Sequence, residues 1–400
     1  MTPDRLLVHF HEIALKGRNR GVFLKALRRN LTTALGDQAG EVRSLGDRLE
    51  VRDPGDGALE RTLRVFGVAN AAPVRAVEAT PTVVLDTALE VAEATDADEP
   101  FETFAVRARR ARTRFPLDSG TVNVEVGEAI RTGLDKAVDL SSPDVTIRIE
   151  IVGDTAYVSA RKFTGAGGLP VGTAGRTVAL LSAGIDSPVA VWRMLKRGSD
   201  VVAVHCHGQP FTDPSSERNV SRILDQLGRW GFRGTWWSVP IGEEQRAITL
   251  GAPARVRVLL YRRLMLRVAE ALAEREDALG IVTGESLAQV ASQTLENLGA
   301  VGAVATLPVL RPLIGHDKAE IIDEARRIGT YDLSVLPHQD CCTLFEPREA
   351  ATRTTADALA RAEADLDVDG ALRRSLERAR RVGPDGDVVG PDRPTGTVSP

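Results

Sequence analysis

The stretch 177–187 (TVALLSAGIDS) decides the fold of the larger part of this chain. The apolar run 177–181 predicts a buried strand, and the small residues after it predict a tight loop. The loop opens a helix predicted over 187–197, with Pro188 in the first turn, where proline is tolerated. Backbone N–H groups in such a turn can close around a phosphate, and the helix N-terminus adds positive partial charge. The stretch therefore predicts an anion-binding loop.

The sequence that follows alternates short apolar runs with helical periodicity, which predicts a parallel sheet covered by helices on both faces. The predicted strands are 177–181, 200–206, 235–239 and 278–284. The predicted helices are 187–197, 215–230, 254–275, 286–298 and 316–328. Just before this α/β pattern, residues 164–175 contain too much glycine and proline for a helix or a central strand, so we expect a hinge there.

The front of the chain has the periodicity of two smaller α+β modules. Its predicted strands are 5–10, short strands near 42–51, and 101–109, 145–151 and 155–161. Its predicted helices are 21–35, 57–66, 83–94 and 118–138. We therefore expect four parts, with the boundaries 1–75, 76–168, 169–350 and 351–400. The last part is expected to be helical and then disordered, since its final residues carry little apolar surface.

Composition excludes several classes of protein. The 51 Lys and Arg residues nearly balance 55 Asp and Glu residues, so the net charge of −4 favours neither a nucleic acid nor a membrane as partner, and a polyanion site has to be a local patch. No apolar run approaches the roughly 20 residues of a membrane helix, and the start lacks a secretory signal. We expect a cytoplasmic protein. Its three cysteines cannot build a disulfide framework, but Cys341 and Cys342 are neighbours.

The loop 182–187 (SAGIDS) lacks the spacing of Walker-type and dinucleotide-binding loops. It resembles the Ser-Gly-Gly-x-Asp-Ser loop of the PP-loop ATP pyrophosphatases, which cleave ATP between the α- and β-phosphates. Asp186 is a candidate Mg²⁺ ligand, because hard cations take carboxylate oxygens. Ala183 replaces the first glycine of that loop, so we expect an intact loop only if Ala183 keeps a negative φ. The alternative is a plain tight turn at a helix start.

Four longer stretches resemble the tRNA 4-thiouridine synthetase (ThiI) family: 12–20 (EIALKGRNR), 167–172 (GGLPVG), 284–295 (GESLAQVASQTL) and 311–322 (RPLIGHDKAEII). The resemblance implies an N-terminal ferredoxin-like domain, a THUMP domain that binds RNA, and a PP-loop domain. It implies an enzyme that uses ATP to adenylate O4 of uridine 8 in tRNA, after which sulfur from a persulfide displaces AMP. A homodimer, and a second role in thiamine thiazole synthesis, are known in the family.

The resemblance also implies a set of nucleotide contacts, which all lie where a parallel sheet binds ligands, at the carboxyl ends of its strands. Lys318 matches a lysine that the family needs for adenylation, where its ammonium would offset developing charge. The alternative for Lys318 is an ordinary solvated lysine on a helix. The implied ATP contacts are Leu180, Leu181, Ser182, Ala183, Gly184, Asp186, Ser187, His205, Cys206, Arg262, Gly284 and Gln293.

The paired cysteines lie in 340–345 (DCCTLF), which resembles the segment that handles sulfur in the family. Cys342 is the first candidate for the reactive thiol and Cys341 the second, with two buried core cysteines as the alternative. Only about fifty residues follow residue 350, so we expect no rhodanese domain. Sulfur is then expected to come from a cysteine desulfurase or another persulfide donor, in preference to an iron–sulfur cluster.

An arginine-rich run, 104–114 (FAVRARRARTR), falls in the part that resembles a THUMP domain. In a strand, Arg107 and Arg109 would share one face, whereas Arg110 and Arg112 are expected on the following loop. Such residues offer phosphate contacts without reading the base sequence. A second, smaller patch contains Lys16 and Arg18. Few aromatic residues accompany the patches, which suits recognition of folded tRNA by its shape.

Two other functions remain open from the residues alone. One is a different PP-loop adenylating enzyme with a small substrate, although such an enzyme has no need of an RNA-binding front half. The other is a catalytically inactive RNA-binding protein, which the exchange at Ala183 makes conceivable. The presence of Asp186, Lys318 and Cys342 argues against the second function.

Overall fold

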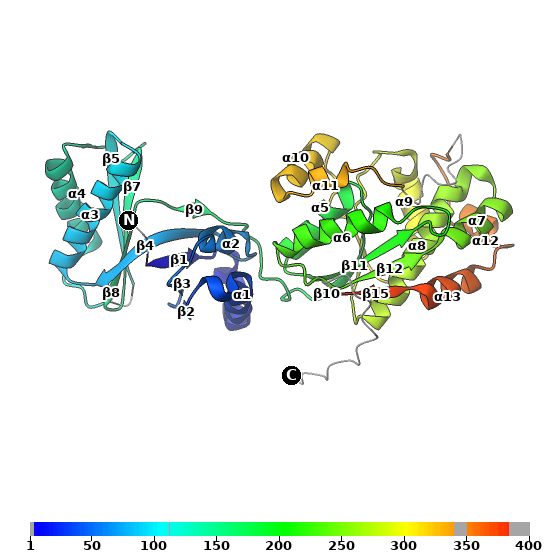
Figure 1. Cartoon of the computed structure of the whole chain (residues 1–400), viewed down its shortest axis with the longest axis horizontal. Coiled ribbons are helices and arrows are strands. Elements are labelled where there is room, and N and C mark those ends of the chain that lie inside the picture. The colour runs from blue at the N-terminus through cyan, green and yellow to red at the C-terminus, as the bar shows by residue number, and fades with distance from the viewer. Residues whose placement is uncertain (1–3, 112, 340–349, 384–400) are drawn as a thin grey trace. The chain divides into compact units, whose positions relative to one another are not determined.

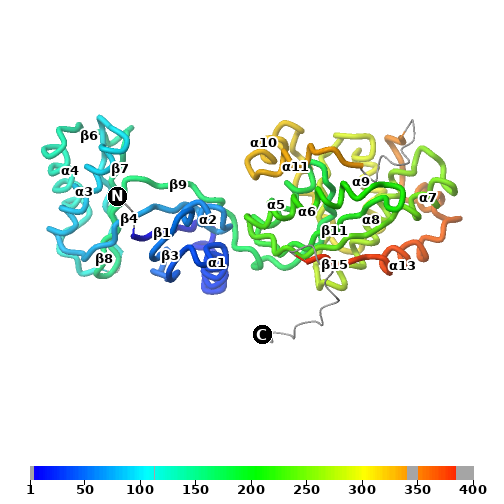
Figure 2. Tube along the Cα trace, viewed as in Figure 1, coloured from blue at the N-terminus to red at the C-terminus, as the bar shows by residue number. Residues whose placement is uncertain are grey.

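The computed structural model describes residues 4–111, 113–339 and 350–383. The chain forms two compact units, residues 1–170 and 171–400, and each is described by itself (Figures 1 and 2). Within the described ranges, no helix is both long and apolar enough to cross a membrane.

One sheet runs through the first unit in the order β2-β3-β1-β4-β8-β7-β5-β6, with β9 beside β4. β4 (Asn70–Glu78) joins its two halves, because residues 70–74 pair with β1 and residues 75–78 pair with β8. The junction at 75/76 that the sequence suggests therefore falls inside a strand. The other strands are β1 (Arg5–His9), β2 (Val42–Ser44), β3 (Arg48–Arg52), β5 (Thr103–Ala111), β6 (Ala137–Val138), β7 (Val145–Val152), β8 (Thr155–Ser159) and β9 (Phe163–Thr164).

Helices cover one face of each half of this sheet. In the first half, Leu27, Leu31 and Leu35 recur at helical spacing on α1 and are fully buried in the core. In the second half, α3 and α4 cover β5, β7 and β8. The helices are α1 (Arg20–Leu35), α2 (Ala58–Arg64), α3 (Pro81–Asp98) and α4 (Ser119–Leu134), with the 3₁₀ turns η1 (Glu12–Asn19) and η2 (Gly36–Gln38).

Beside β4, side chains of β1 and β3 in the first half of the sheet contact side chains of β7 and β8 in the second half. The Tyr157 hydroxyl donates to a carboxylate oxygen of Glu50 at 3.1 Å, and the His9 ring contacts the carboxylate of Glu150 at 2.9 Å. Burial raises the pKa of Glu150, but the His9 ring and the Arg48 guanidinium outweigh this and hold the pKa below its ordinary value. These polar contacts tie the two halves of the first unit together.

The second unit has a six-stranded sheet in the order β14-β13-β10-β11-β12-β15, in which β15 alone is antiparallel to its neighbour. The chain runs from β10 to β11 and β12 on one side and then returns to β13 on the other side of β10. This reversal creates a switch point between the carboxyl ends of β10 and β13. The strands are β10 (Arg176–Leu180), β11 (Asp200–His207), β12 (Trp236–Pro240), β13 (Ile281–Val282), β14 (Val309–Leu310) and β15 (Arg380–Val382).

Because crossovers between parallel strands are almost always right-handed, connections on the two sides of β10 put helices on both faces of the sheet, as predicted. α5 and α6 pack on β11, with α10 and α11 outside them, whereas α8 packs on β10 and β13 (Figure 1). The helices are α5 (Asp186–Lys196), α6 (Ser215–Gly228), α7 (Gly242–Gly251), α8 (Arg257–Arg275), α9 (Leu295–Gly302), α10 (Lys318–Ile328), α11 (Tyr331–Ser334), α12 (Ala356–Glu363) and α13 (Val368–Arg378), with the 3₁₀ turns η3 (Ala254–Val256) and η4 (Ala291–Gln293).

The predicted helix over 286–298 is wrong. Residues 283–290 form a loop, and α9 begins only at Leu295, because the Thr294 side chain caps it by accepting from the backbone N–H of Asn297. Ala288 has a positive φ of 61°, which a helix cannot contain. The sequence pattern did not predict β4, α7, β14 or β15.

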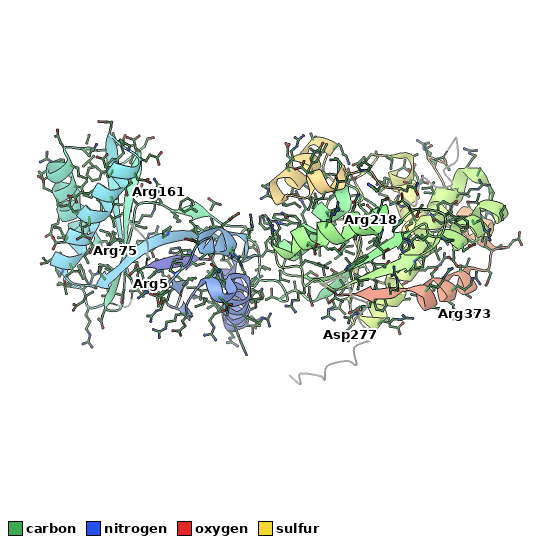
Figure 3. The ribbon with its side chains drawn as sticks, viewed as in Figure 1. Arg5, Arg75, Arg161, Arg218, Asp277 and Arg373 are labelled. Atoms are coloured by element: carbon green, nitrogen blue, oxygen red, sulfur yellow. The ribbon has the colours of Figure 1, made fainter. Side chains whose placement is uncertain are left out.

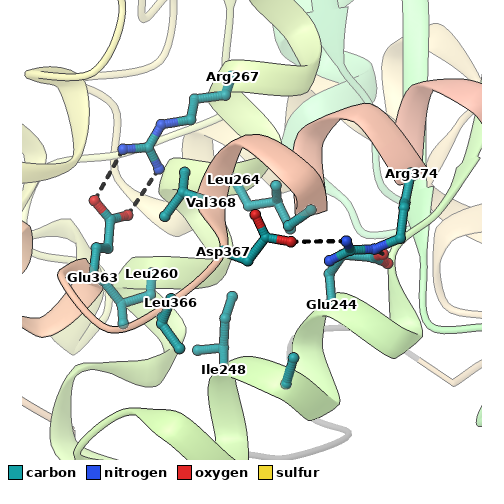
Figure 4. A pocket seen from close by; sticks show the side chains of 12 residues that line it. Glu244, Ile248, Leu260, Leu264, Arg267, Glu363, Leu366, Asp367, Val368 and Arg374 are labelled. Atoms are coloured by element: carbon teal, nitrogen blue, oxygen red, sulfur yellow. Dashed lines mark hydrogen bonds and ion pairs between the residues drawn. The ribbon is translucent and has the colours of Figure 1, made fainter.

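The C-terminal helices α12 and α13 dock onto α7 and α8 around a cavity of about 60 Å³ (Figure 4). Apolar side chains form much of its wall, and Arg267 donates to both carboxylate oxygens of Glu363 at 2.8 and 2.9 Å. Arg374 donates to Asp367 at 2.9 Å on the other side (Figure 4). None of the predicted site residues lines this cavity, so its ion pairs serve packing of the C-terminal segment.

Candidate functional site

The loop between β10 and α5 is closed by its own serines. The backbone N–H of Ser182 donates to the hydroxyl of Ser187 at 2.9 Å, and the two hydroxyls lie 3.1 Å apart. Ala183 is 2% exposed and does not adopt a positive φ. The expectation of an intact loop at Ala183 is therefore confirmed, because a methyl group is tolerated there.

Gly284 follows β13 and lies against the start of α5. A Cβ atom on Gly284 would come within 2.7 Å of both the N and the Cα atoms of Ser187, and within 3.0 Å of the carbonyl carbon of Asp186. These are backbone atoms and cannot swing aside. The two sides of the switch point therefore touch here, and only glycine permits the contact.

Asp186 is the centre of the site. Lys318 Nζ lies 2.6 Å from its Oδ1 atom, and Gln289 Nε2 donates to its Oδ2 atom at 2.9 Å. The Asp186 side chain is 19% exposed and that of Lys318 is 45% exposed. In addition, Ser334 donates from its hydroxyl to the carbonyl of Gly184 at 3.3 Å. The structure thus brings the predicted Asp186 and Lys318 together with two residues that the sequence analysis did not single out.

A capping box places Lys318 at the first position of α10. Asp317 accepts from the backbone N–H of Glu320 at 2.9 Å, and Glu320 accepts from the backbone N–H of Asp317 at 3.0 Å. Arg193 on α5 donates to Glu324 on α10 at 2.5 Å, which ties the two helices together. The lysine therefore starts from a fixed helix end beside the loop.

Gln289 reaches Asp186 from the loop between β13 and η4, which is pinned at several points. The Leu287 N–H donates to the carbonyl of Ile314 at 3.1 Å, and the Ala288 N–H donates to the carbonyl of Gln293 at 2.9 Å. The incorrect helix prediction hid this loop. Thr294 is the residue from which the correct helix start could have been predicted. Threonine is favoured at the position just before a helix, three residues before Asn297 here, and is disfavoured in the middle of one.

Arg262 fixes the same loop from α8. Its guanidinium donates to the carbonyl of Ser292 at 2.9 Å and to the buried carboxylate of Glu285, which also accepts from Arg311 at 2.5 Å and from Thr283 at 2.9 Å. Burial lowers the pKa of Arg311. In this structure the predicted nucleotide contact Arg262 supports the loop.

His205 and Cys206 lie near the carboxyl end of β11 with side chains only 3% and 6% exposed. His205 Nδ1 lies 2.9 Å from the Leu181 carbonyl oxygen, which links β11 to the first residue after β10. The adjacent His207 contacts the Ser238 hydroxyl at 3.1 Å. Burial, followed by the nearby His205, lowers the pKa of His207 to about 4, so His207 is neutral at pH 7.

The remaining predicted nucleotide contacts lie around the same switch point. Leu180 ends β10 and Leu181 follows it, while Gln293 ends η4 with a buried side-chain oxygen that has no hydrogen-bond partner in the described part of the chain. Cys341 and Cys342 lie outside the described residues.

The predicted tRNA contacts lie in the first unit, whose side chains Figure 3 shows. Arg107 and Arg109 are exposed on one face of β5, and Arg107 pairs in register with Arg148 on β7. Arg110 is in the strand and not on a loop, because β5 extends to Ala111, and its guanidinium donates to the Phe115 carbonyl at 2.5 Å. The other members of the set are Lys16 and Arg18, which lie in η1, and Arg112, which lies outside the described residues.

A cage of protein ligands for a metal ion is absent from the described residues. No group of three or more His, Cys, Asp or Glu side chains in these ranges could hold a metal ion. Asp186 is therefore a single carboxylate at a helix start, beside the oxygen atoms of the serine loop. This donor set suits Mg²⁺ that is held jointly by one carboxylate and a phosphate ligand, because Mg²⁺ keeps few protein ligands.

Comparisons with known proteins cover nearly the whole chain. Three family models match: the ThiI ferredoxin-like domain over residues 5–72, the THUMP domain over 82–161, and the thiamine biosynthesis protein ThiI over 172–368. The chain is 42% identical to a probable tRNA sulfurtransferase of Moorella thermoacetica, over 96% of this chain and 99% of the relative. It is 40% identical to one of Thermus thermophilus, over 92% and 91%.

A solved structure with the same architecture is a 4-thiouridine synthetase in complex with RNA and with ATP bound. The match has a TM-score of 0.88 and 33% identity, and it covers 95% of this chain and 99% of that chain.

Proposed function

This chain belongs to the ThiI family, and from that membership we propose that it is an ATP-dependent tRNA sulfurtransferase that makes 4-thiouridine. The observation that carries the proposal is the convergence of Asp186, Lys318 and the serine loop at the switch point of the sheet. Open parallel sheets bind ligands at this place. The bound ATP in the similar 4-thiouridine synthetase supports the same substrate here.

In the proposed first step, O4 of uridine 8 attacks the α-phosphorus of ATP and pyrophosphate leaves. The loop 182–187 and the N-terminus of α5 bind the phosphates through backbone N–H groups and the helix dipole. Lys318 is within reach of the loop, and its ammonium offsets the charge that develops on the leaving oxygen. Leu180, His205, Cys206, Arg262 and Gln293 stay candidates for contacts to the rest of the nucleotide.

Mg²⁺ is the proposed cofactor, with Asp186 as its protein ligand. When bound, Mg²⁺ would neutralise part of the negative charge of the phosphates and so favour the departure of pyrophosphate. Asp186 then has to release one of its present partners, because both of its oxygens accept hydrogen bonds from the protein.

In the proposed second step, a persulfide sulfur attacks C4 of the adenylated uridine and AMP leaves. Cys342, or Cys341 beside it, is the proposed thiol that handles sulfur. A cysteine desulfurase or another persulfide donor would supply the sulfur, and attack by a second thiol would release the product with formation of a disulfide.

The first unit is proposed to bind tRNA. Arg107 and Arg109 are exposed side by side on β5, and Arg148 extends the cationic strip on β7. The RNA in the similar 4-thiouridine synthetase complex supports this assignment. A homodimer, a cytoplasmic location and a contribution to thiamine synthesis complete the proposal as expectations from the family.

The test is a thiolation assay with unmodified tRNA, ATP, Mg²⁺, cysteine and a desulfurase. We expect near-ultraviolet absorbance of 4-thiouridine, and its loss in Asp186→Ala, Lys318→Met and Cys342→Ser. Asp323→Ala is the matched control, because it removes a carboxylate of α10 that is 77% exposed and whose ion pair among the described residues is with Arg326 in the same helix. RNA binding without thiolation would favour a catalytically inactive RNA-binding protein. AMP formation at a rate that does not depend on tRNA would favour an adenylating enzyme with a small substrate.

A further inference from the structure

Gln289 shares the carboxylate of Asp186 with Lys318. The lysine ammonium contacts Oδ1 at 2.6 Å, and the Gln289 amide donates to Oδ2 at 2.9 Å. The amide nitrogen has to face Asp186, since an ionised carboxylate only accepts hydrogen bonds. The two oxygens of one catalytic carboxylate are therefore held by two different kinds of donor.

The two bonds differ in how readily they can be exchanged. Lys318 is 45% exposed, and exposed ion pairs contribute little because water screens them. A triphosphate carries more negative charge than one carboxylate and competes well for the ammonium. The side-chain oxygen of Gln289, in contrast, is buried and has no hydrogen-bond partner among the described residues, so the bond to Asp186 is what anchors its amide.

The backbone around Gln289 is fixed in an unusual conformation. Ala288 has a φ of 61°, in the left-handed region that non-glycine residues rarely adopt. Hydrogen bonds from Leu287 to Ile314 and from Ala288 to Gln293 hold the loop on either side. Strained backbone persists only where the surroundings maintain it, and it is common at functional sites. Here it aims one amide at Asp186.

We propose that Gln289 is a positioning residue for the divalent cation. It keeps Oδ2 of Asp186 in place, so that Oδ1 is free to face the cation when Lys318 transfers to the triphosphate. Because a neutral amide does not cancel the charge of Asp186, the carboxylate retains its full attraction for the cation. The inference rests on the proposed function and assigns to Gln289 no contact with substrate or reacting atoms.

The test measures ATP binding by calorimetry at a series of Mg²⁺ concentrations, without tRNA. Gln289→Met keeps the side-chain length and removes the donor. We expect the apparent affinity for Mg²⁺ in the presence of ATP to fall roughly ten- to a hundredfold, as for one lost charge-assisted hydrogen bond. ATP binding in EDTA should stay within about twofold of wild type. Val290→Ala, an exposed position on the same loop, is the control and should leave both values unchanged.

A double-mutant cycle separates positioning from a general structural effect. In an Asp186→Asn background, Gln289→Met should cause no further loss of Mg²⁺ affinity, because the residue acts through the Asp186 carboxylate. An unchanged Mg²⁺ dependence in Gln289→Met would overturn the inference, and so would an equal loss of ATP binding in EDTA. Wild-type protein that binds no ATP with or without Mg²⁺ would instead overturn the proposed function, and the inference with it.

Discussion

Replacement of Gly284 by alanine should uncouple the two sides of the nucleotide site. The new Cβ atom would lie 2.7 Å from the N and Cα atoms of Ser187, about 0.7 Å short of the 3.4 Å at which ordinary contact begins. Both are backbone atoms at the start of α5, so either α5 or the loop after β13 has to move by that amount. Overpacking of this kind costs about 1–3 kcal/mol of stability. For a unit of this size, that lowers Tm by about 2–12 °C.

The effect of Gly284→Ala on activity should exceed its effect on stability. A displacement approaching 1 Å at a site that positions reacting groups can cost about 10²-fold in rate. The assay is single-turnover AMP formation with saturating tRNA and ATP, at a temperature well below the melting transition. Gly299→Ala is the matched control, since a Cβ atom there meets nothing within 4 Å, and in a helix it should add about 0.5–1 kcal/mol of stability. Wild-type rate and Tm in Gly284→Ala would refute the steric argument.

Three further changes should have defined outcomes. Glu363→Ala leaves the buried Arg263 guanidinium without its carboxylate partner and should cost about 3–5 kcal/mol in urea unfolding. The folded-state pKa of His207 is about 4, below its ordinary value, so its stabilising neutral form is complete above pH 6.5 and lost as pH falls toward 4. By pH 5 the unfolding free energy should drop by up to about 2 kcal/mol, and in His207→Gln it should depend less on pH between 6.5 and 4. Arg107→Ala with Arg109→Ala should weaken tRNA binding and reduce the slope of log K against log salt by about 1.4–1.8.

Each of these outcomes has its own control. Arg131→Ala removes an exposed arginine that already pairs with Glu128, so it should cost less than about 1 kcal/mol and leave the salt slope of tRNA binding unchanged. A Glu363→Ala protein as stable as Arg131→Ala would contradict the buried-pair argument. If His207→Gln loses stability between pH 6.5 and 4 as the wild type does, the acid sensitivity belongs to other groups. An unchanged salt slope in the variant with Arg107→Ala and Arg109→Ala would exclude β5 from the tRNA contacts.

Local sequence was sufficient to predict elements whose structure is determined by a few neighbouring residues. The run 177–188 predicts strand, loop and helix start because four apolar residues, small residues and an early Pro188 each act over a few positions. It was insufficient over 284–298, where apolar residues recur at helical spacing although the backbone turns at Ala288. Contacts with Ile314 and with Arg262, distant in sequence, hold this loop.

The sequence by itself determined the family, the parallel sheet of the second unit and the identity of Asp186 and Lys318 as candidates, because these follow from short motifs and periodicity. Only the tertiary structure decided how they meet. Lys318 reaches Asp186 across 132 positions because α10 packs on α5, and Gln289 joins them because the chain crosses after β12 to the other side of β10, where it forms β13. It also revealed that Gly284 is a steric requirement and that β4 serves both halves of the first unit. Such facts depend on distances between remote segments, which no local pattern contains.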